Sequence, residues 1–122
     1  MKLRIKGNSL RYRLSRSEVG KLANTGYLEE QTLFGEIKFI YALETVKEGN
    51  ELSAQLDQNK ITMFVPVSLV NDWPKNDVVG FNATMQLTDN NSLYLLLEKD
   101  FICLDETTED QSDHYENPNK TC

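Results

Sequence analysis

Apolar and polar residues alternate along the first fourteen residues of the chain, MKLRIKGNSLRYRL. A period of two is typical of strands that are buried on one face only. The pair Gly7-Asn8 interrupts the alternation and suits a two-residue hairpin turn with glycine at its first central position. The sequence therefore predicts a β-hairpin with one apolar face, whose members are Leu3, Ile5, Leu10, Tyr12 and Leu14.

The opposite face of this hairpin is expected to be strongly basic. A two-residue turn pairs Lys6 with Ser9, Arg4 with Arg11 and Lys2 with Arg13. Like charges directly opposite each other in a sheet are unfavourable, so an anionic partner is expected to compensate them. The predicted basic face consists of Lys2, Arg4, Lys6, Arg11 and Arg13.

A helix is expected directly after the hairpin, over residues 16–25. Ser15 and Glu18 match a capping box, in which each side chain binds the other residue's backbone N–H. Gly26 is well placed to end this helix. A single helical turn is expected after Pro66 and is stopped by Pro74.

Further strand signals recur at intervals of roughly 8–12 residues, the spacing of an antiparallel sheet, sandwich or partly open barrel. They lie at residues 27–34, 37–43, 52–56, 61–65, 81–87 and 93–97. We therefore predict a β-dominated α+β class: an antiparallel curved sheet or partly open barrel with one helix near the N-terminus. Its aromatic residues, Tyr94 among them, alternate with the strand period and are predicted to serve packing.

The length of 122 residues suits one domain. We expect a single β-rich domain over residues 1–104 and an acidic C-terminal tail over residues 105–122, with no internal repeat. No apolar run is long enough for a membrane span, and the N-terminus does not resemble an export signal, so a cytoplasmic location is expected.

Charge is distributed unevenly along the chain. The net charge is −6, which disfavours non-specific binding of nucleic acid by the whole molecule. Residues 1–26 nevertheless hold seven Lys and Arg against one Glu, whereas residues 98–122 hold eight Asp and Glu against two Lys. The basic face is thus a local feature of an acidic protein.

The basic face is either simply solvated or compensated by negative charge from one of two sources. In the first, the tail folds back over the arginines, which favour bidentate contacts with carboxylates. In the second, a phosphate-bearing ligand or an acidic protein surface binds there, with the tail as a competitor. The tail residues concerned are Asp105, Glu106, Glu109, Asp110 and Asp113.

Thiol and imidazole groups in the last twenty residues are candidate zinc ligands, namely Cys103, His114 and Cys122. Their spacing matches no zinc-finger pattern, and a buried structural thiol is the competing explanation for Cys103. No other cofactor is predicted. The sequence also contains no nucleophile-elbow motif and no glycine-rich phosphate loop.

The two ends of the chain, KLRIKGNSLRYRLSRSEV and LLLEKDFICLDETTEDQSDHYENPN, resemble a small family of uncharacterised bacterial proteins. The matching positions are Arg4 to Leu14, Ser17 to Val19 and Glu98 to Asn119. The resemblance implies a cytoplasmic bacterial protein without assigned function, and it supplies no catalytic residues.

Taken together, these patterns favour a non-enzymatic module that binds an anion or an acidic partner on the basic face. One alternative is a phosphoanhydride-processing or metal-dependent enzyme, which needs clustered Arg and Glu side chains on an interior face. Candidate carboxylates for such an enzyme are Glu29, Glu30, Glu36 and Glu98. Another alternative is a structural accessory protein with no ligand.

Overall fold

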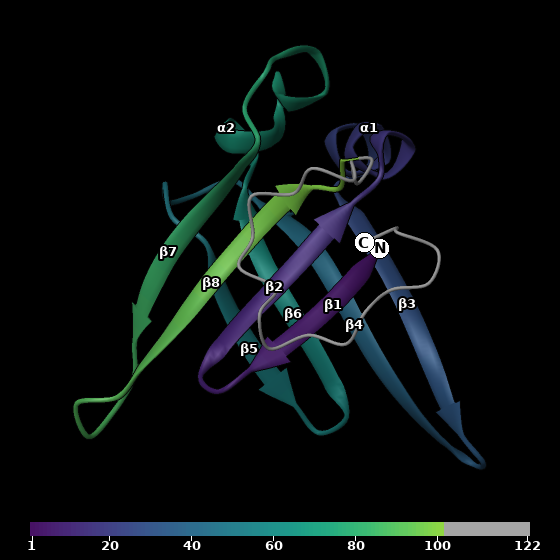
Figure 1. Ribbon diagram of the computed structural model, residues 1–122, viewed down its shortest axis with the longest axis vertical. Coiled ribbons are helices and arrows are strands. Elements are labelled where there is room, and N and C mark those ends of the chain that lie inside the picture. Colours follow the sequence, from purple (N-terminus) through teal and green to yellow (C-terminus); the bar gives the residue numbers. More distant parts are fainter. Residues whose placement is uncertain (102–122) are drawn as a thin grey trace, which may run out of the picture.

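The computed structural model describes residues 1–101, which form eight strands, two α-helices and one 3-10 helix. The strands build two four-stranded sheets that face each other (Figure 1). Sheet A contains β1 (Lys2–Lys6), β2 (Ser9–Leu14), β8 (Ser92–Lys99) and β7 (Gly80–Gln86), in that order. Sheet B contains β3 (Tyr27–Phe34), β4 (Ile37–Val46), β6 (Lys60–Pro66) and β5 (Ser53–Asp57).

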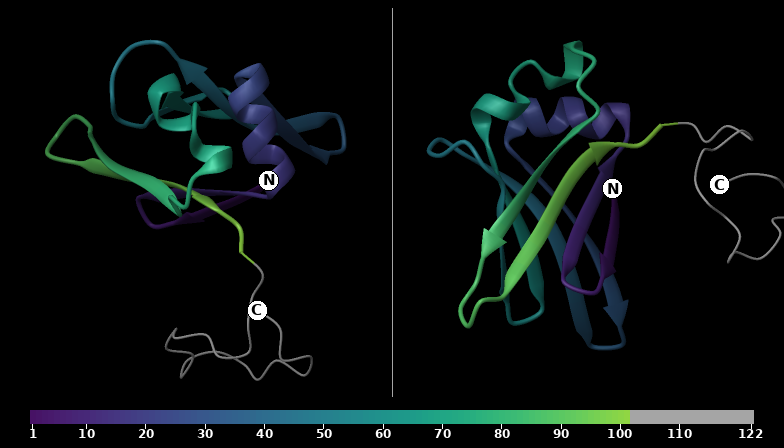
Figure 2. Two further views of the ribbon diagram at one scale, coloured as in Figure 1. Left: turned by 90° about the horizontal axis from the view of Figure 1, so that it is seen from above. Right: turned by 60° about the vertical axis from the view of Figure 1, so that its left-hand side comes forward.

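The helices lie together at one end of the two sheets, as the turned views show (Figure 2). They are α1 (Arg16–Thr25), α2 (Val67–Val70) and the 3-10 helix η1 (Trp73–Lys75). Helix α1 has the bounds that its capping box predicts. The backbone N–H of Ser15 donates to the Glu18 carboxylate at 2.9 Å, the Glu18 N–H donates to the Ser15 hydroxyl, and Gly26 ends the helix at φ +77°.

The first hairpin forms in the predicted register, with Arg4 opposite Arg11 and Lys6 opposite Ser9. Gly7 has φ +54°, a conformation that glycine adopts at little cost. The six further strands occur within a few residues of their predicted positions. The β-dominated α+β class is therefore confirmed.

The predicted single antiparallel sheet or partly open barrel is wrong in detail. Residues 1–101 form two separate sheets, neither closed into a barrel, and each has a parallel pair at its centre. Strand β2 pairs with β8, and β4 pairs with β6. Each parallel pair joins strands from two different hairpins, β1–β2 with β7–β8 and β3–β4 with β5–β6, so the period of any one strand carries no signal for it.

The two sheets repeat one arrangement, although no internal repeat is evident in the sequence. In each, two antiparallel hairpins meet through one parallel pair, and each of the two halves of the chain gives one hairpin to each sheet. The hairpin turn of β5 and β6 matches that of β1 and β2, because Gln58 has φ +53° where Gly7 has +54°. Buried Leu10, Tyr12, Leu14, Val19 and Leu22 thereby correspond to buried Ile61, Met63, Val65, Val70 and Trp73.

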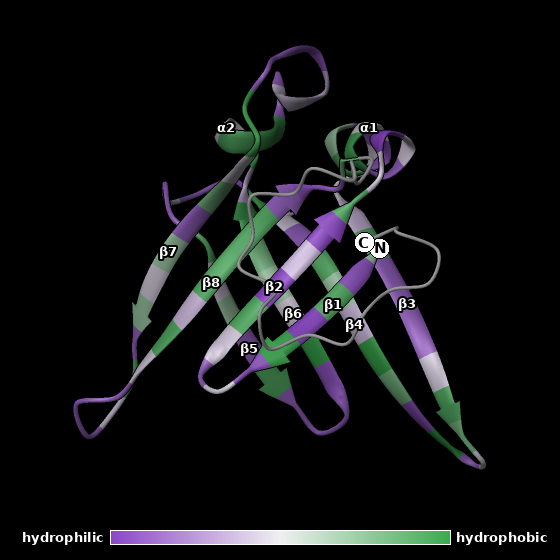
Figure 3. Cartoon of the chain, in the orientation of Figure 1, coloured by the Kyte–Doolittle hydropathy of each residue, from purple (hydrophilic) through white to green (hydrophobic). Residues whose placement is uncertain are grey.

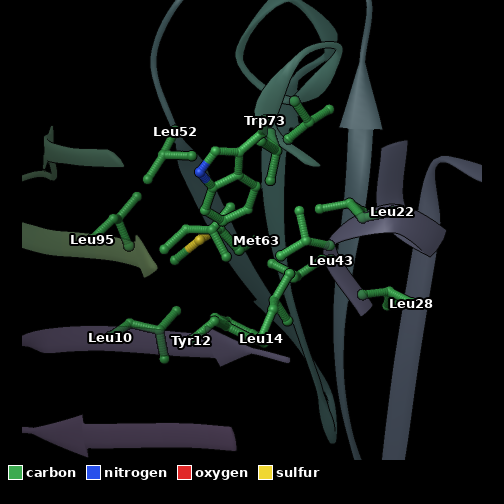
Figure 4. Packing of buried hydrophobic residues seen from close by; sticks show 14 of the residues in the cluster. Leu10, Tyr12, Leu14, Leu22, Leu28, Leu43, Leu52, Met63, Trp73 and Leu95 are labelled. Atoms are coloured by element: carbon green, nitrogen blue, oxygen red, sulfur yellow. The ribbon is translucent and has the colours of Figure 1, made fainter. Parts of the chain in front are cut away.

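The core lies between the sheets and under the helices (Figure 4). The ring of Tyr12 is fully buried, and its hydroxyl donates to the backbone oxygen of Ile61 in the opposite sheet at 3.4 Å. Burial raises the pKa of Tyr12. Trp73 closes the helical end, where its Nε1–H donates to the Val78 carbonyl at 2.7 Å. Apart from the Tyr12 hydroxyl, the buried side chains between the sheets are apolar, and buried Thr62 belongs to the outer face of sheet B.

Candidate functional site

All five residues of the predicted basic face lie on the outer face of sheet A. Successive side chains of a strand point to opposite faces, and the inner positions of β2 are the buried residues Leu10, Tyr12 and Leu14. The alternation of hydrophobic and hydrophilic residues along β1 and β2 is visible in Figure 3. The basic face therefore forms as one surface that points away from the core, and its members are Lys2, Arg4, Lys6, Arg11 and Arg13.

Glu98 of β8 holds the two central arginines of this face. Its Oε1 accepts from Nε of Arg11 at 2.6 Å and from Nε of Arg13 at 2.8 Å. The Glu98 side chain is only 13% exposed. Ion pairs that are partly shielded from water are stronger than exposed ones. Much of the compensating charge that the sequence calls for therefore comes from within sheet A.

Asp100 neutralises a third cation, at the edge of the same face. Its carboxylate lies 2.9 Å from Nζ of Lys2. The hydrogen bond from Lys2 lowers the pKa of Asp100 below its usual value. The predicted tail partners Asp105, Glu106, Glu109, Asp110 and Asp113 lie outside the described residues.

Arg4 and Lys6 are the two cations of the basic face that have no ion pair or side-chain hydrogen bond within residues 1–101. Both side chains are exposed. They border a shallow hollow of about 290 Å³ on the outer face of sheet A. Its lining residues are Arg4, Lys6, Ser9, Leu10, Arg11, Tyr94 and Leu96.

Tyr94 and Leu96 belong to this hollow, whereas the sequence pattern predicts that the aromatic ring serves packing. The inner positions of β8 are Leu95 and Leu97, which are fully buried. Tyr94 alternates with these residues along the strand, so its side chain points to the outer face, where it is 43% exposed. Tyr94 therefore lies outside the core, although cross-strand packing with its neighbours stays possible. The apolar run from Leu93 to Leu97 conceals the alternation in the sequence. The signal available in the sequence was Glu98, a charged residue four positions after Tyr94, which places both side chains on the same outward face of the strand.

The outer face of sheet B gives a direct comparison, because the two sheets repeat one arrangement. The positions equivalent to Arg4, Lys6 and Arg11 are occupied by Gln55, Asp57 and Thr62. Lys2 and Arg13 correspond to Ser53 and Phe64. No cation therefore occupies any of the five equivalent places, whereas Glu98 has a counterpart in Glu44.

Two other hollows differ in character from the basic face. The larger, about 670 Å³, lies beside the start of α1 and is lined by charges of both signs, such as Lys99 and Asp77. There Lys99 already donates to the Asn76 carbonyl at 2.8 Å and lies over the Trp73 ring. The other, about 410 Å³, is mainly apolar and lies beside the first hairpin turn.

The predicted zinc ligands Cys103, His114 and Cys122 lie outside the described residues. Within residues 1–101 no group of three or more His, Cys, Asp or Glu side chains is arranged to hold a metal ion. The carboxylates considered for an enzyme are also separated, because Glu98 lies on sheet A whereas Glu29 and Glu30 belong to β3 of sheet B.

A family model described as a family of unknown function (DUF7009) matches residues 1–119 of the chain. Comparison with curated proteins found no match, and comparison with solved structures found none either. None of the helices in residues 1–101 is long and apolar enough to span a membrane.

Proposed function

The chain belongs to this family of unknown function, and we propose that it is a binding module that holds a phosphate-bearing anion on the basic face of sheet A. The anion lies in the hollow beside Arg4 and Lys6, the two cations of the basic face that have no ion pair or side-chain hydrogen bond within residues 1–101. The fork of N–H donors on arginine suits phosphate, and a nearby lysine adds a second positive charge.

The observation that carries this proposal is the contrast between the two sheets. Sheet B forms the same strand order and the same hairpin turn with Gln55, Asp57 and Thr62 at the places of Arg4, Lys6 and Arg11. The fold therefore does not require cations at these positions. Arg4 stands directly opposite Arg11, and like charges in that position are unfavourable, although Glu98 offsets part of the repulsion. A bound anion offsets the remaining repulsion.

The phosphoanhydride enzyme finds less support in the geometry. Such an enzyme needs its cations on an interior surface around the substrate, but the side chains of the basic face point outward. The interior between the sheets is filled by apolar residues, among them Tyr12, Met63 and Leu97. A small anion also suits the hollow of about 290 Å³ better than a broad acidic protein surface does.

Isothermal titration calorimetry of the full chain with pyrophosphate tests the proposal. We expect saturable binding that weakens as salt rises, because the contact is electrostatic and solvent-exposed. Arg4→Gln and Lys6→Gln should each reduce the affinity about tenfold. Lys47→Gln is the matched control, since Lys47 is exposed in the loop after β4, and it should leave the affinity unchanged. Equal titration of all four proteins, or no heat with any of them, contradicts the proposal.

The acidic residues from 105 onward enter the proposal as a competitor for the same cations. A full-length variant with Asp105→Asn, Glu106→Gln, Glu109→Gln, Asp110→Asn and Asp113→Asn tests this part. If these side chains compete, the neutralised variant binds pyrophosphate more tightly than the wild type at low salt. If they do not compete, the two proteins bind pyrophosphate with the same affinity at low salt as well as at about 0.5 M salt, where the difference in net charge is screened.

A further inference from the structure

The outer face of sheet A changes character from one edge to the other. Strands β1 and β2 carry the cations, and β8 presents Tyr94 and Leu96 beside them. The far edge, β7, presents neutral polar side chains at the matching positions, Asn82 opposite Leu96 and Thr84 opposite Tyr94. Both Asn82 and Thr84 are exposed. A ligand that crosses the sheet therefore meets positive charge, then an aromatic and apolar strip, then hydrogen-bonding groups.

The aromatic strip is immediately beside the cations. Tyr94 and Leu96 line the same hollow as Arg4, Lys6 and Arg11. In the strand register Tyr94 stands between two small side chains, Ser9 and Thr84. Adjacent strands are about 4.8 Å apart, so β8 lies about 10 Å from β1 across the sheet. An anionic group and a flat ring within one small molecule span such a distance.

We infer that the ligand of the basic face is a nucleoside phosphate, whose phosphate lies at Arg4 and Lys6 and whose base stacks on Tyr94. This inference rests on the proposed function. Bases stack on exposed aromatic side chains whatever their identity, and neighbouring amide and hydroxyl groups bind their polar edges. Asn82 and Thr84 of β7 are placed for that second role.

Sheet B again serves as the comparison. The place of Tyr94 is taken by Ile40, and the place of Leu96 is taken by Ala42. At the outer edge Glu29 stands where Asn82 does in sheet A. Gln31 stands where Thr84 does, so half of the neutral edge is kept. The ring and the cations, by contrast, occur together on sheet A and are together absent from the equivalent places of sheet B.

A nucleoside phosphate reaches such a face either as a free nucleotide or as one residue of a single strand. The net charge of −6 opposes a long polyanion. The hollow of about 290 Å³ is also small, so we assign it to a free nucleotide. The two sources differ in the salt dependence of binding, because a strand releases several counterions and a mononucleotide releases few.

The experiment compares AMP with ribose 5-phosphate by calorimetry on the full chain, with Tyr94→Leu and Tyr94→Phe as variants. Stacking makes AMP bind about tenfold more tightly than ribose 5-phosphate. Tyr94→Leu removes that difference and Tyr94→Phe keeps it. Phe101→Leu is the control, because it removes another exposed ring that lies outside the hollow of the basic face and should change neither affinity.

The outcomes separate this inference from the proposed function. Equal affinity for AMP and ribose 5-phosphate, with both weakened about tenfold in Arg4→Gln, overturns the nucleoside assignment and leaves the anion site standing. Binding of neither compound and no binding of pyrophosphate overturns both. A tetranucleotide that binds far more tightly than AMP, with a steep salt dependence, overturns the assignment to a free nucleotide.

Discussion

Asn8 and Asn59 perform the same task in the two sheets. The side-chain amide of Asn8 donates to the Ser92 carbonyl at 2.6 Å, and that of Asn59 donates to the Lys38 carbonyl. The backbone carbonyl of Asn8 accepts from the backbone N–H of Tyr94 at 3.0 Å, and that of Asn59 accepts from the backbone N–H of Ile40 at 2.9 Å. Each asparagine therefore ties a hairpin turn to the strand that runs parallel to the second strand of that hairpin.

Replacing either asparagine should weaken the fold to a similar degree. Asn8→Ala and Asn59→Ala each remove one side-chain hydrogen bond between distant segments, and we expect each to lower the free energy of unfolding by about 0.5–1.5 kcal/mol. Urea denaturation followed by circular dichroism measures this. Asn50→Ala, in the loop between β4 and β5, is the control and should change stability little. A loss confined to one of the two asparagines contradicts their equivalence.

Gly80 and Gly20 should respond to alanine in opposite directions. A Cβ at Gly80 would clash with the Leu97 carbonyl oxygen and lie 2.7 Å from Cβ of Glu98. We therefore expect Gly80→Ala to destabilise the protein by about 1–3 kcal/mol. A Cβ at Gly20, inside α1, meets nothing within 4 Å. Gly20→Ala should stabilise the helix by up to about 1 kcal/mol. Thermal unfolding distinguishes the two, and equal effects contradict the packing of β7 against β8.

Much of the local structure was predictable from the sequence. The turn at Gly7-Asn8 fixes the register of the first hairpin, and the pair Ser15 and Glu18 fixes the start of α1. Both signals are local, because a turn or a cap is decided by residues a few positions apart. The predicted basic face formed for the same reason: strand alternation alone places its five cations on one side.

The pairing of the hairpins was not predictable in the same way. The parallel contact of β2 with β8 joins Ser9 to Tyr94, and turn chemistry does not encode so distant a neighbour. The repeat was hidden because its equivalent residues share burial and seldom identity, as in Tyr12 and Met63 or Leu22 and Trp73. The sequence indicates Glu98 only as a candidate enzyme carboxylate, because its contact with Arg11 and Arg13 depends on that parallel pairing.

Removing the charge of Glu98 should weaken the fold and strengthen anion binding. In Glu98→Gln the guanidinium groups of Arg11 and Arg13 lose their shielded carboxylate, which should cost about 1–3 kcal/mol of stability. The same change makes the basic face more positive, so pyrophosphate should bind several-fold more tightly.

Glu44→Gln is the matched control for Glu98→Gln. Glu44 occupies the equivalent place in sheet B, is exposed and has no ion pair within residues 1–101. Denaturation and calorimetry on both variants should show an effect only for Glu98. If Glu44→Gln reproduces the gain in pyrophosphate affinity, the gain reflects net charge and not the basic face.

The contact between Lys2 and Asp100 should appear in the acid limb of the stability curve. Because Lys2 lowers the pKa of Asp100 in the folded protein, the folded state binds that proton less readily than the unfolded state does. The stabilisation is complete above the ordinary Asp pKa of about 3.9 and is lost as the pH falls through the lowered folded value.

Urea denaturation between about pH 6 and pH 2 measures this loss. Asp100→Asn and Lys2→Gln should each make the fall in stability towards low pH shallower. The double variant should match either single variant, since both remove the same contact. Additive effects of the two substitutions contradict a direct pair between these residues.

Proton–nitrogen NMR spectra of the full chain, recorded during titration with pyrophosphate, test most directly whether the basic face of sheet A binds anions. The informative variant is Arg4→Gln, Lys6→Asp and Arg11→Thr combined, which gives sheet A the residues that sheet B holds at these places. We predict saturable shifts of the backbone amides of β1 and β2, none in β5 and β6, and loss of the shifts in the triple variant. Shifts spread equally over both sheets, or a folded triple variant that titrates like the wild type, would contradict the account.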